Sequence, residues 1–550
     1  LAVSTTDLVC SGSEIPASNI VFNVPSSTIP AGESVLVHAT IAIPEDTVPG
    51  TYTGTFHVGP DSVDVPVEIE ILPGSGTETQ VVLGDGQARA VTYTDADGTV
   101  ITVTHRGGTA TLRFVGDNLQ QNAGRRGVIV TGDNVRIDRI TLSGTTDRSS
   151  LTFRTNRGGN GLATVGEITG STPLGKLIGR TIDLDGVGIN MTGEGYIGSI
   201  QLHDIKNGAD IVMPGNDATR GITIRAGQLY ADTDIVLGSC LKNLTATQWV
   251  GSSLTAPWVY SISIKGQRGN PRRGVLGVPG DFGANLNLTG QDRRGVSLGK
   301  LSVAGRIIDS NITLAGAAGT ITAAQWDSGS LNATLAKRIA IKGNRRNPAI
   351  TGDFGANLNL TGQNRRGVSL GKLSVAGRII DSNITLAGAA GTITAAQWDT
   401  GSLNATSAKS ITIKGNRRNP AIIGDLSADL NFTGQDRRGV SLGKLSVAGR
   451  IIDSNITLAG AAGTIRAGQW NSGSLNATSA KNITIKGDRR NPAIAGNLSA
   501  NVNLTGGDRR GVSLGKLSVA GRIIDSNITL AGTAGTITAA QWDTGSLNAT

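Results

Sequence analysis

The residues best suited to chemistry in this sequence are arginines that occur in adjacent pairs. A guanidinium group matches the geometry of carboxylate, sulfate and phosphate groups, so rows of such pairs suit a polymeric anion. The pairs recur through the second half of the chain and predict two basic rows. They are Arg272-Arg273, Arg293-Arg294, Arg345-Arg346, Arg365-Arg366, Arg417-Arg418, Arg437-Arg438, Arg489-Arg490 and Arg509-Arg510.

A simpler interpretation is that each arginine pair is solvated or neutralised on its own loop. The acids that precede the pairs or share their loops are Asp281, Asp292, Asp353, Asp425, Asp436 and Asp508. Asn364 and Asn497 replace an acid in two copies, although the arginines of those copies stay. The sequence leaves both interpretations open.

Tryptophan recurs at one position of the same pattern, always after glutamine. These tryptophans are Trp249, Trp326, Trp398, Trp470 and Trp542. Each is either a corner residue that packs against its own loop or part of an exposed aromatic ladder. An exposed ladder would stack on sugar rings.

Asp95 and Asp97 lie in the run Asp-Ala-Asp-Gly between two alternating segments. This arrangement predicts a β-hairpin turn. The two carboxylates also match part of a calcium-binding loop, although the glutamate that completes an EF-hand is missing. Calcium is the one cofactor that the sequence suggests.

The sequence contains no motif that commits it to catalysis. His38, His57, His105 and His203 are scattered without metal-ligand spacing, and neither a nucleophile elbow nor a phosphate-binding loop is present. A carbohydrate-active site would need carboxylates in the irregular part of the chain. Those that cluster there are Asp204, Asp210, Asp217, Asp232 and Asp234, which also suit turns.

These candidate residues are positioned by a repeat. Lys300, Lys372, Lys444 and Lys516 occupy the same place in near-identical segments, at intervals of 72 residues. A fixed period of this kind indicates stacked structural units. Because such units repeat a surface whereas an enzyme needs its site once, the sequence predicts a non-enzymatic protein.

Short alternating segments within each repeat predict strands, with Leu301, Ile321, Ile339 and Leu373 opening successive coils. No segment has helical periodicity, and the 78 glycines argue against long helices. The prediction is a mainly β chain, with a parallel β-helix-like β-solenoid of three coils per 72-residue repeat, preceded by a β-sandwich. Rows of exposed Thr-x-Thr, which an ice-binding solenoid would need, are absent.

Composition supports a thin β-structure. Aromatic residues are 3% and charged residues 17% of the chain, and the net charge of +9 favours anionic partners. Cys10 and Cys240 are too few for a disulfide framework, and no run of 18 apolar residues predicts a membrane span. The sequence stops within a repeat, so we expect the natural chain to continue.

The N-terminal region differs from the repeats. The run from Ile43 to Gly54 (Ile-Pro, then Pro-Gly-Thr-Tyr-Thr-Gly) resembles bacterial immunoglobulin-like domains. The predicted domains are an immunoglobulin-like β-sandwich over 1–73, a linker over 74–79, a β-hairpin cap over 80–124, irregular solenoid coils over 125–261 and the regular repeats over 262–550.

The run from Thr92 to Thr99 (Thr-Tyr-Thr-Asp-Ala-Asp-Gly-Thr), followed by Gly-rich strands and near-identical repeats, resembles the giant repetitive exported proteins of planctomycete-type bacteria. That resemblance implies an extracellular or cell-surface location and no catalytic residues. We therefore expect a structural or adhesive rod whose partner is acidic polysaccharide or another surface polymer, without specific nucleic-acid binding. The alternative is a polysaccharide lyase or glycosidase on a β-helix.

Overall fold

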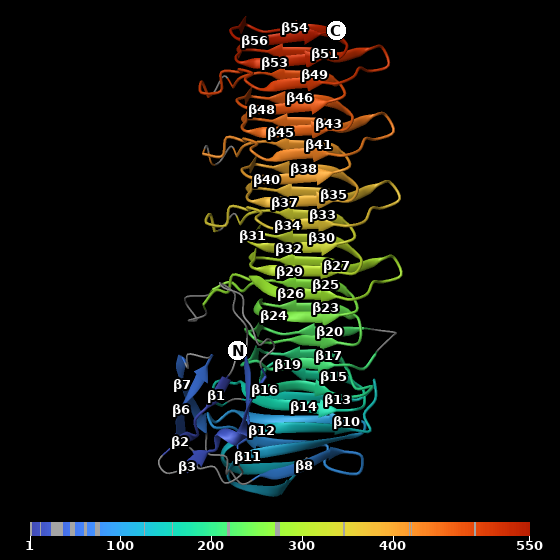
Figure 1. Ribbon diagram of the computed structural model, residues 1–550. Helices are drawn as coiled ribbons and strands as arrows, with labels where there is room; N and C mark the ends of the chain where they lie inside the picture. The colour runs from blue at the N-terminus through green and yellow to red at the C-terminus, as the bar shows by residue number, and fades with distance from the viewer. Residues whose placement is uncertain are drawn as a thin grey trace.

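The computed structural model describes residues 3–10, 13–23, 37–43, 50–59, 63–71, 78–125, 127–156, 158–216, 221–269, 276–344, 347–416, 419, 421–488 and 491–549. The protein is mainly β, with 63% of its residues in strands and no α-helix in these ranges. Most strands stack into a tall parallel sheet assembly (Figure 1).

The N-terminal segment forms its own antiparallel sheet, in the order β1-β6-β2-β3 with β7 beside β6. Strands β4 and β5 form a separate antiparallel pair. A small core of Leu8, Ile15, Ile20 and Tyr52 supports the segment. The elements are β1 (Val3–Thr5), β2 (Leu8–Cys10), β3 (Ser13–Ile15), the 3-10 helix η1 (Ala17–Asn19), β4 (Ile20–Asn23), β5 (His38–Ile41), β6 (Gly50–Val58) and β7 (Val63–Ile71).

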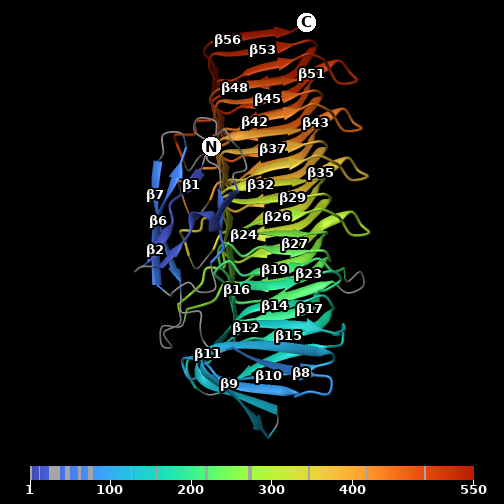
Figure 2. The same ribbon diagram turned by 60° about the horizontal axis from the view of Figure 1, so that its bottom comes forward.

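An antiparallel cap precedes the parallel stack and is seen at the bottom of Figure 2. Its strands are β8 (Thr79–Gly84), β9 (Ala90–Thr94), β10 (Val100–Arg106), β11 (Thr109–Gly124) and β12 (Gly127–Ser143). Thr79 starts a strand rather than ending a linker. Because β12 pairs antiparallel with β11 and parallel with β14, it connects the antiparallel strands to the parallel stack just after the predicted boundary at residue 124.

The first face of the stack is a parallel sheet in which Leu301 pairs with Ile321, Ile321 with Ile339 and Ile339 with Leu373. These are the residues predicted to open successive coils. The strands of this face are β13 (Ser150–Thr155), β15 (Leu174–Gly179), β17 (Ile197–Leu202), β20 (Ile222–Arg225), β23 (Leu241–Ala246), β25 (Val259–Ile264), β27 (Val296–Val303), β30 (Ala317–Ala323), β33 (Ala336–Ile341), β35 (Val368–Val375), β38 (Ala389–Ala395), β41 (Ala408–Ile413), β43 (Val440–Val447), β46 (Ala461–Ala467), β49 (Ala480–Ile485), β51 (Val512–Val519) and β54 (Thr533–Thr538).

The second face is built of very short strands and was not predicted, because two-residue strands show no periodicity. Each coil therefore has three sides instead of two. The strands are β18 (Ile205–Lys206), β21 (Gln228–Leu229), β28 (Arg306–Ile307), β31 (Gln325–Trp326), β36 (Arg378–Ile379), β39 (Gln397–Trp398), β44 (Arg450–Ile451), β47 (Gln469–Trp470), β52 (Arg522–Ile523) and β55 (Gln541–Trp542).

The third face completes each coil. Its strands are β19 (Asp210–Met213), β22 (Ile235–Leu237), β29 (Ser310–Leu314), β32 (Gly329–Ala333), β34 (Asn357–Leu360), β37 (Ser382–Leu386), β40 (Gly401–Ala405), β42 (Asp429–Phe432), β45 (Ser454–Leu458), β48 (Gly473–Ala477), β50 (Asn501–Leu504), β53 (Ser526–Leu530) and β56 (Gly545–Ala549). Four longer strands cover the second and third faces together: β14 (Ala163–Gly170), β16 (Ile182–Met191), β24 (Gln248–Ala256) and β26 (Phe282–Leu288). This stack is compatible with the predicted β-solenoid.

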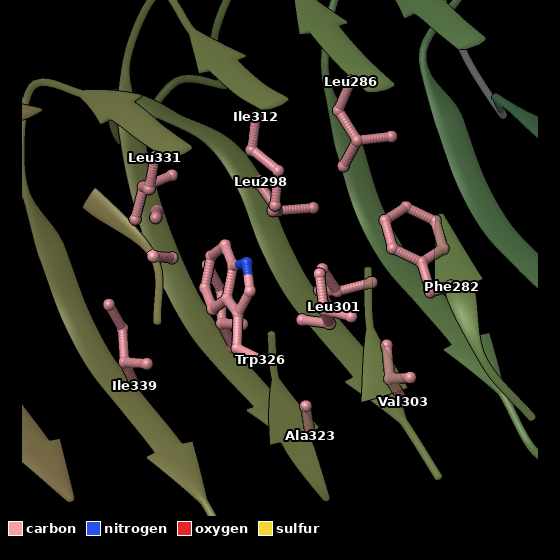
Figure 3. Packing of buried hydrophobic residues seen from close by; sticks show 14 of the residues in the cluster. Phe282, Leu286, Leu298, Leu301, Val303, Ile312, Ala323, Trp326, Leu331 and Ile339 are labelled. Carbon is pink, nitrogen blue, oxygen red and sulfur yellow. The ribbon is translucent and has the colours of Figure 1, made fainter. Parts of the chain in front are cut away.

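One continuous hydrophobic core runs through the stack, formed by the inward side chains of all three faces. Figure 3 shows Leu301, Ile312 and Trp326 pointing into it from the first, third and second faces. Coils approach so closely that a Cβ added at Gly319 would lie 2.1 Å from the carbonyl oxygen of Gly299. The first face therefore tolerates no side chain at Gly319.

The repeated tryptophans belong to this core, so the predicted sugar-stacking ladder is wrong. Trp249, Trp326, Trp398 and Trp470 have no exposed surface, and only Trp542, in the last coil, is 37% exposed. Trp326 is stacked between Ile307 and Phe354 in the neighbouring coils. An indole enclosed on both sides cannot reach a sugar ring.

The contrast between Trp398 and Trp542 allows a matched test of this packing. Replacing Trp398 by Ala removes a fully buried side chain and should cost about 3–5 kcal/mol. Trp542 keeps more than a third of its surface in water, so Trp542→Ala should cost less, about 2 kcal/mol. Hydrogen exchange should accelerate in the coils next to residue 398 in the first variant. Equal effects of the two substitutions would contradict the core assignment.

Candidate functional site

The first face is cationic along its whole length. Alternation along each strand directs residues such as Leu301 and Val303 inward and Lys300 outward. None of the first-face strands contains Asp or Glu. The exposed cations on these strands are Arg154, Lys176, Arg225, Lys242, Lys300, Lys337, Arg338, Lys372, Lys409, Lys444, Arg466, Lys481 and Lys516.

Strand register aligns several of these cations into a column. Lys300 pairs with Thr320, Thr320 with Arg338 and Arg338 with Lys372. The column continues from Lys372 through Thr392 to Ser410. Cations therefore recur along the stack axis, separated by a small polar residue at Thr320 and at Thr392 but stacked directly at Arg338 and Lys372.

The described arginine pairs lie on turns that lead directly into first-face strands. These turns project one above another beside β27, β35, β43 and β51 (Figure 1). The eight arginines, all exposed and in no ion pair with another described residue, are Arg293, Arg294, Arg365, Arg366, Arg437, Arg438, Arg509 and Arg510. The structure thus places one of the two predicted rows at the edge of the cationic face.

The second predicted row lies outside the described residues. It comprises Arg272, Arg273, Arg345, Arg346, Arg417, Arg418, Arg489 and Arg490.

The residue before each described pair holds the turn. Asp292 Oδ1 accepts hydrogen bonds from the backbone N–H groups of Arg294 (2.8 Å) and Val296 (2.9 Å). Asn364 makes the same two contacts in the next copy. An amide oxygen can replace a carboxylate oxygen in this role, which explains how the arginines persist without the acid.

The same turn contacts affect protonation. The backbone N–H groups of Arg510 and Val512 hold the pKa of Asp508 below its usual value, and the charge of Arg510 adds a smaller contribution.

A groove of about 980 Å³ lies between two successive arginine turns. Arg365 and Arg366 line one side, Arg437 and Arg438 the other, and Lys409 of the first face is between them. The groove combines several guanidinium donors with an ammonium group. It can hold carboxylate or sulfate groups without burying them.

The other acids of the repeats were predicted to share the loops of the paired arginines, but the structure assigns them to different arginines. On the second face, Asp425 Oδ1 accepts the backbone N–H of Arg450 at 2.6 Å, and Oδ2 lies 2.7 Å from its Nη2. Asp281 and Asp353 accept the backbone N–H groups of Arg306 and Arg378. These three acids therefore do not neutralise the described pairs. The described pairs are solvated, as the simpler interpretation predicts, and anion binding by their row stays a prediction.

The predicted hairpin is present at Asp95 and Asp97, between β9 and β10. Both Oδ1 atoms accept the backbone N–H of Thr99, at 2.8 and 2.9 Å, and Asp97 Oδ2 accepts that of Asn160 at 2.8 Å. Burial, followed by the hydrogen bond with Asp97, raises the pKa of Asp95 from 3.8 to about 6. Hydrogen bonds to Asp95 and Thr99 lower the pKa of Asp97. Calcium binding stays a prediction.

A cluster that sequence analysis missed lies in the irregular coils. His203 Nδ1 is 2.7 Å from Asp183 Oδ1 and 3.7 Å from Asp204 Oδ2, and Lys206 Nζ is 2.6 Å from Asp183 Oδ2. Asp183 and Asp204 are 21 residues apart, close to the 22-residue coil spacing of this region. That spacing was the signal that could have predicted their contact.

The other aspartates of this region do not join the cluster. Asp210 Oδ1 accepts the backbone N–H of Asp234, and Asp234 Oδ1 accepts that of Ser253. Burial raises the pKa of Asp210. Asp232 has a positive φ of 62°, which is typical of a turn. Asp217 lies outside the described residues.

No family model, curated protein or solved structure matches this chain. Within the ranges that the structure describes, no helix has the length and apolar character needed to cross a membrane. The functional argument therefore depends on the geometry of the cationic face.

The raised pKa of Asp95 gives a pH-dependent prediction. A folded-state pKa above the unfolded value favours the protonated carboxyl, so its contribution to stability is full below pH about 4 and is lost as the pH rises through about 6. Asp95→Asn keeps the turn acceptor without the charge. It should slow hydrogen exchange of β9 and β10 at pH 7.5 and change it little at pH 4.

The opposite substitution and calcium provide the controls. Asp97→Asn should accelerate exchange at pH 7.5, because Asp97 accepts several hydrogen bonds as a carboxylate. If millimolar Ca²⁺ protects the hairpin in the natural sequence but not in Asp95→Asn, the aspartates bind calcium and the plain-turn interpretation is wrong.

Proposed function

We propose that this protein is a structural and adhesive rod that binds acidic polysaccharide along its first face. In this proposal an immunoglobulin-like domain precedes a β-solenoid whose unit is the 72-residue, three-coil repeat. The observation that carries the proposal is the absence of acids from the first-face strands, combined with exposed cations in register.

The repeat suits a polymer better than a small ligand. Coils separated by about 4.8 Å place equivalent groups of successive repeats about 14 Å apart. Each repeat adds an arginine pair at the edge and a lysine on the strand that follows, as in Arg365, Arg366 and Lys372. Weak contacts repeated along one chain add up through multivalency.

An extracellular or cell-surface location belongs to the same proposal, since acidic polysaccharides accumulate there. Its support is the resemblance of the sequence to repetitive exported proteins. We propose no enzymatic activity, because a repeated surface does not build a single catalytic site. Of the carboxylates on which a glycosidase or lyase would depend, Asp210 and Asp234 bind backbone groups of neighbouring coils.

The test compares two variants of the full chain with the same change in net charge. In the first, Arg365, Arg366, Arg437 and Arg438 become Gln. In the second, the four second-face arginines become Gln; these are Arg306, Arg378, Arg450 and Arg522. Binding to hyaluronate, chondroitin sulfate, neutral dextran and double-stranded DNA would be measured at several salt concentrations.

The natural chain should bind hyaluronate or chondroitin sulfate, ignore dextran and lose affinity as salt rises. The first variant should bind about 10-fold more weakly or worse, because four exposed charge-assisted contacts are lost. The second should bind nearly as well as the natural chain. If both variants lose the same affinity for the acidic polysaccharides, net charge alone explains binding and the first face is not the site. If the natural chain binds DNA more tightly than either polysaccharide, the proposed ligand is wrong.

A further inference from the structure

The second face carries a column of outward-facing residues that connects neighbouring coils. In this column a carboxylate or amide oxygen accepts the backbone N–H of the residue one coil further along. Asp204 Oδ1 accepts the N–H of Gln228 at 2.7 Å, and Asp425 Oδ1 accepts that of Arg450 at 2.6 Å. Asp183 Oδ1 likewise accepts the N–H of Asp204 at 3.1 Å.

The start of this column is electrostatically different from the rest. From Asp281 onward, the residue above each acid is an arginine, as at Arg306 and Arg378. Above Asp183, the next residue of the column is a second acid, Asp204. Two carboxylates stacked about 4.8 Å apart repel each other. They require positive charge nearby.

The stacked acids are held in place and largely withdrawn from water. Asp183 is 5% exposed and Asp204 is 7% exposed. Asp204 uses Oδ1 for the backbone of Gln228, while its Oδ2 lies 3.7 Å from His203 Nδ1, beyond hydrogen-bond distance. This oxygen faces the imidazole, so the two groups are placed to share one metal ion.

Three donor atoms converge at this point. One atom from each of Asp183, His203 and Asp204 lies within 4.8 Å of the other two. Imidazole nitrogen with carboxylate oxygens is a donor set typical of Zn²⁺ and related divalent transition metals, whereas Ca²⁺ prefers oxygen donors alone. Three protein ligands leave room for water or for a ligand from outside.

We propose that Asp183, His203 and Asp204 form a site for a divalent transition-metal ion, with Zn²⁺ as the best-matched ion. The ion would bridge two successive coils and neutralise the stacked carboxylates. The site lies between the cap and the regular repeats, so the ion would cross-link the irregular coils. In these coils the column lacks the arginine that neutralises its acids elsewhere.

Lys206 is the internal competitor for this site. Its ammonium lies 2.6 Å from Asp183 Oδ2. A bound metal would displace this ammonium. Removing the lysine charge should therefore strengthen metal binding.

The test is titration of the full chain with Zn²⁺ by isothermal calorimetry at pH 7.5. The natural chain should bind one ion at this site. His203→Gln should weaken binding at least about 10-fold, because the nitrogen ligand is lost, and Lys206→Met should tighten it about 3-fold or more. The matched control is His57→Gln, since His57 also lies 2.7 Å from an aspartate, Asp64, but without a second acid.

Binding with Co²⁺ in place of Zn²⁺ separates this site from the cysteines. An absorption spectrum without a sulfur-to-metal band supports nitrogen and oxygen ligands, whereas a thiolate band would assign the ion to Cys10 or Cys240. The proposal is overturned if no stoichiometric ion binds, if His57→Gln weakens binding as much as His203→Gln, or if Lys206→Met leaves the affinity unchanged. None of these results depends on the cationic face.

Discussion

Parallel pairing between successive coils is the constraint on which the rest of this structure depends. Each strand satisfies its backbone hydrogen bonds with the coils on either side, so every residue is held over an equivalent residue of its neighbours. Inward columns must then fill a narrow core without voids, and outward columns must place compatible groups over one another. The side chains that a position accepts therefore depend on the residues at the same position in the neighbouring coils as much as on the strand itself.

The inward columns show how volume is managed. Trp326 lies between Ile307 and Phe354, and its ring meets that of Phe354 edge-on, with centroids 5.6 Å apart. In the next copy Leu426 takes the place of phenylalanine. Because the large indole recurs only once in three coils, smaller neighbours on both sides can accommodate it. The tryptophan fills the core of the stack and does not form part of its surface.

The outward columns show how charge is managed. On the second face, acids and arginines alternate with glutamine and neutralise one another, as Asp425 and Arg450 do. On the first face, the strands that carry the lysines and arginines contain no Asp or Glu. The fold thus gathers cations on strands that carry no acid, even though the net charge of +9 is modest for 550 residues.

The same logic distinguishes the irregular coils from the regular repeats. There the column contains Asp183 directly below Asp204. The cation beside them is Lys206, with His203 also 2.7 Å from Asp183, instead of an arginine one coil further along. Among the described coils this arrangement occurs once, which marks a place with its own chemistry. The regular repeats, by contrast, use one solution again in every copy.

The sequence by itself determined the strands of the first and third faces and the order of the coils. Alternation at Leu301 and Val303, together with the interval of 72 residues, is a local and repeated signal. The arginine pairs were also visible, because adjacent residues need no fold to bring them together. The hairpin at Asp95 was predictable for the same reason.

Only the tertiary structure decided which residues of successive coils are stacked over one another. The two-residue strands of the second face carry no periodicity, so the burial of Trp326 and the pairing of Arg450 with Asp425 could not be predicted from local sequence. The contact of Asp183 with His203 joins residues one coil apart in a region of irregular spacing. Such contacts depend on register between coils, which the backbone hydrogen bonds of the stack set and the local sequence does not.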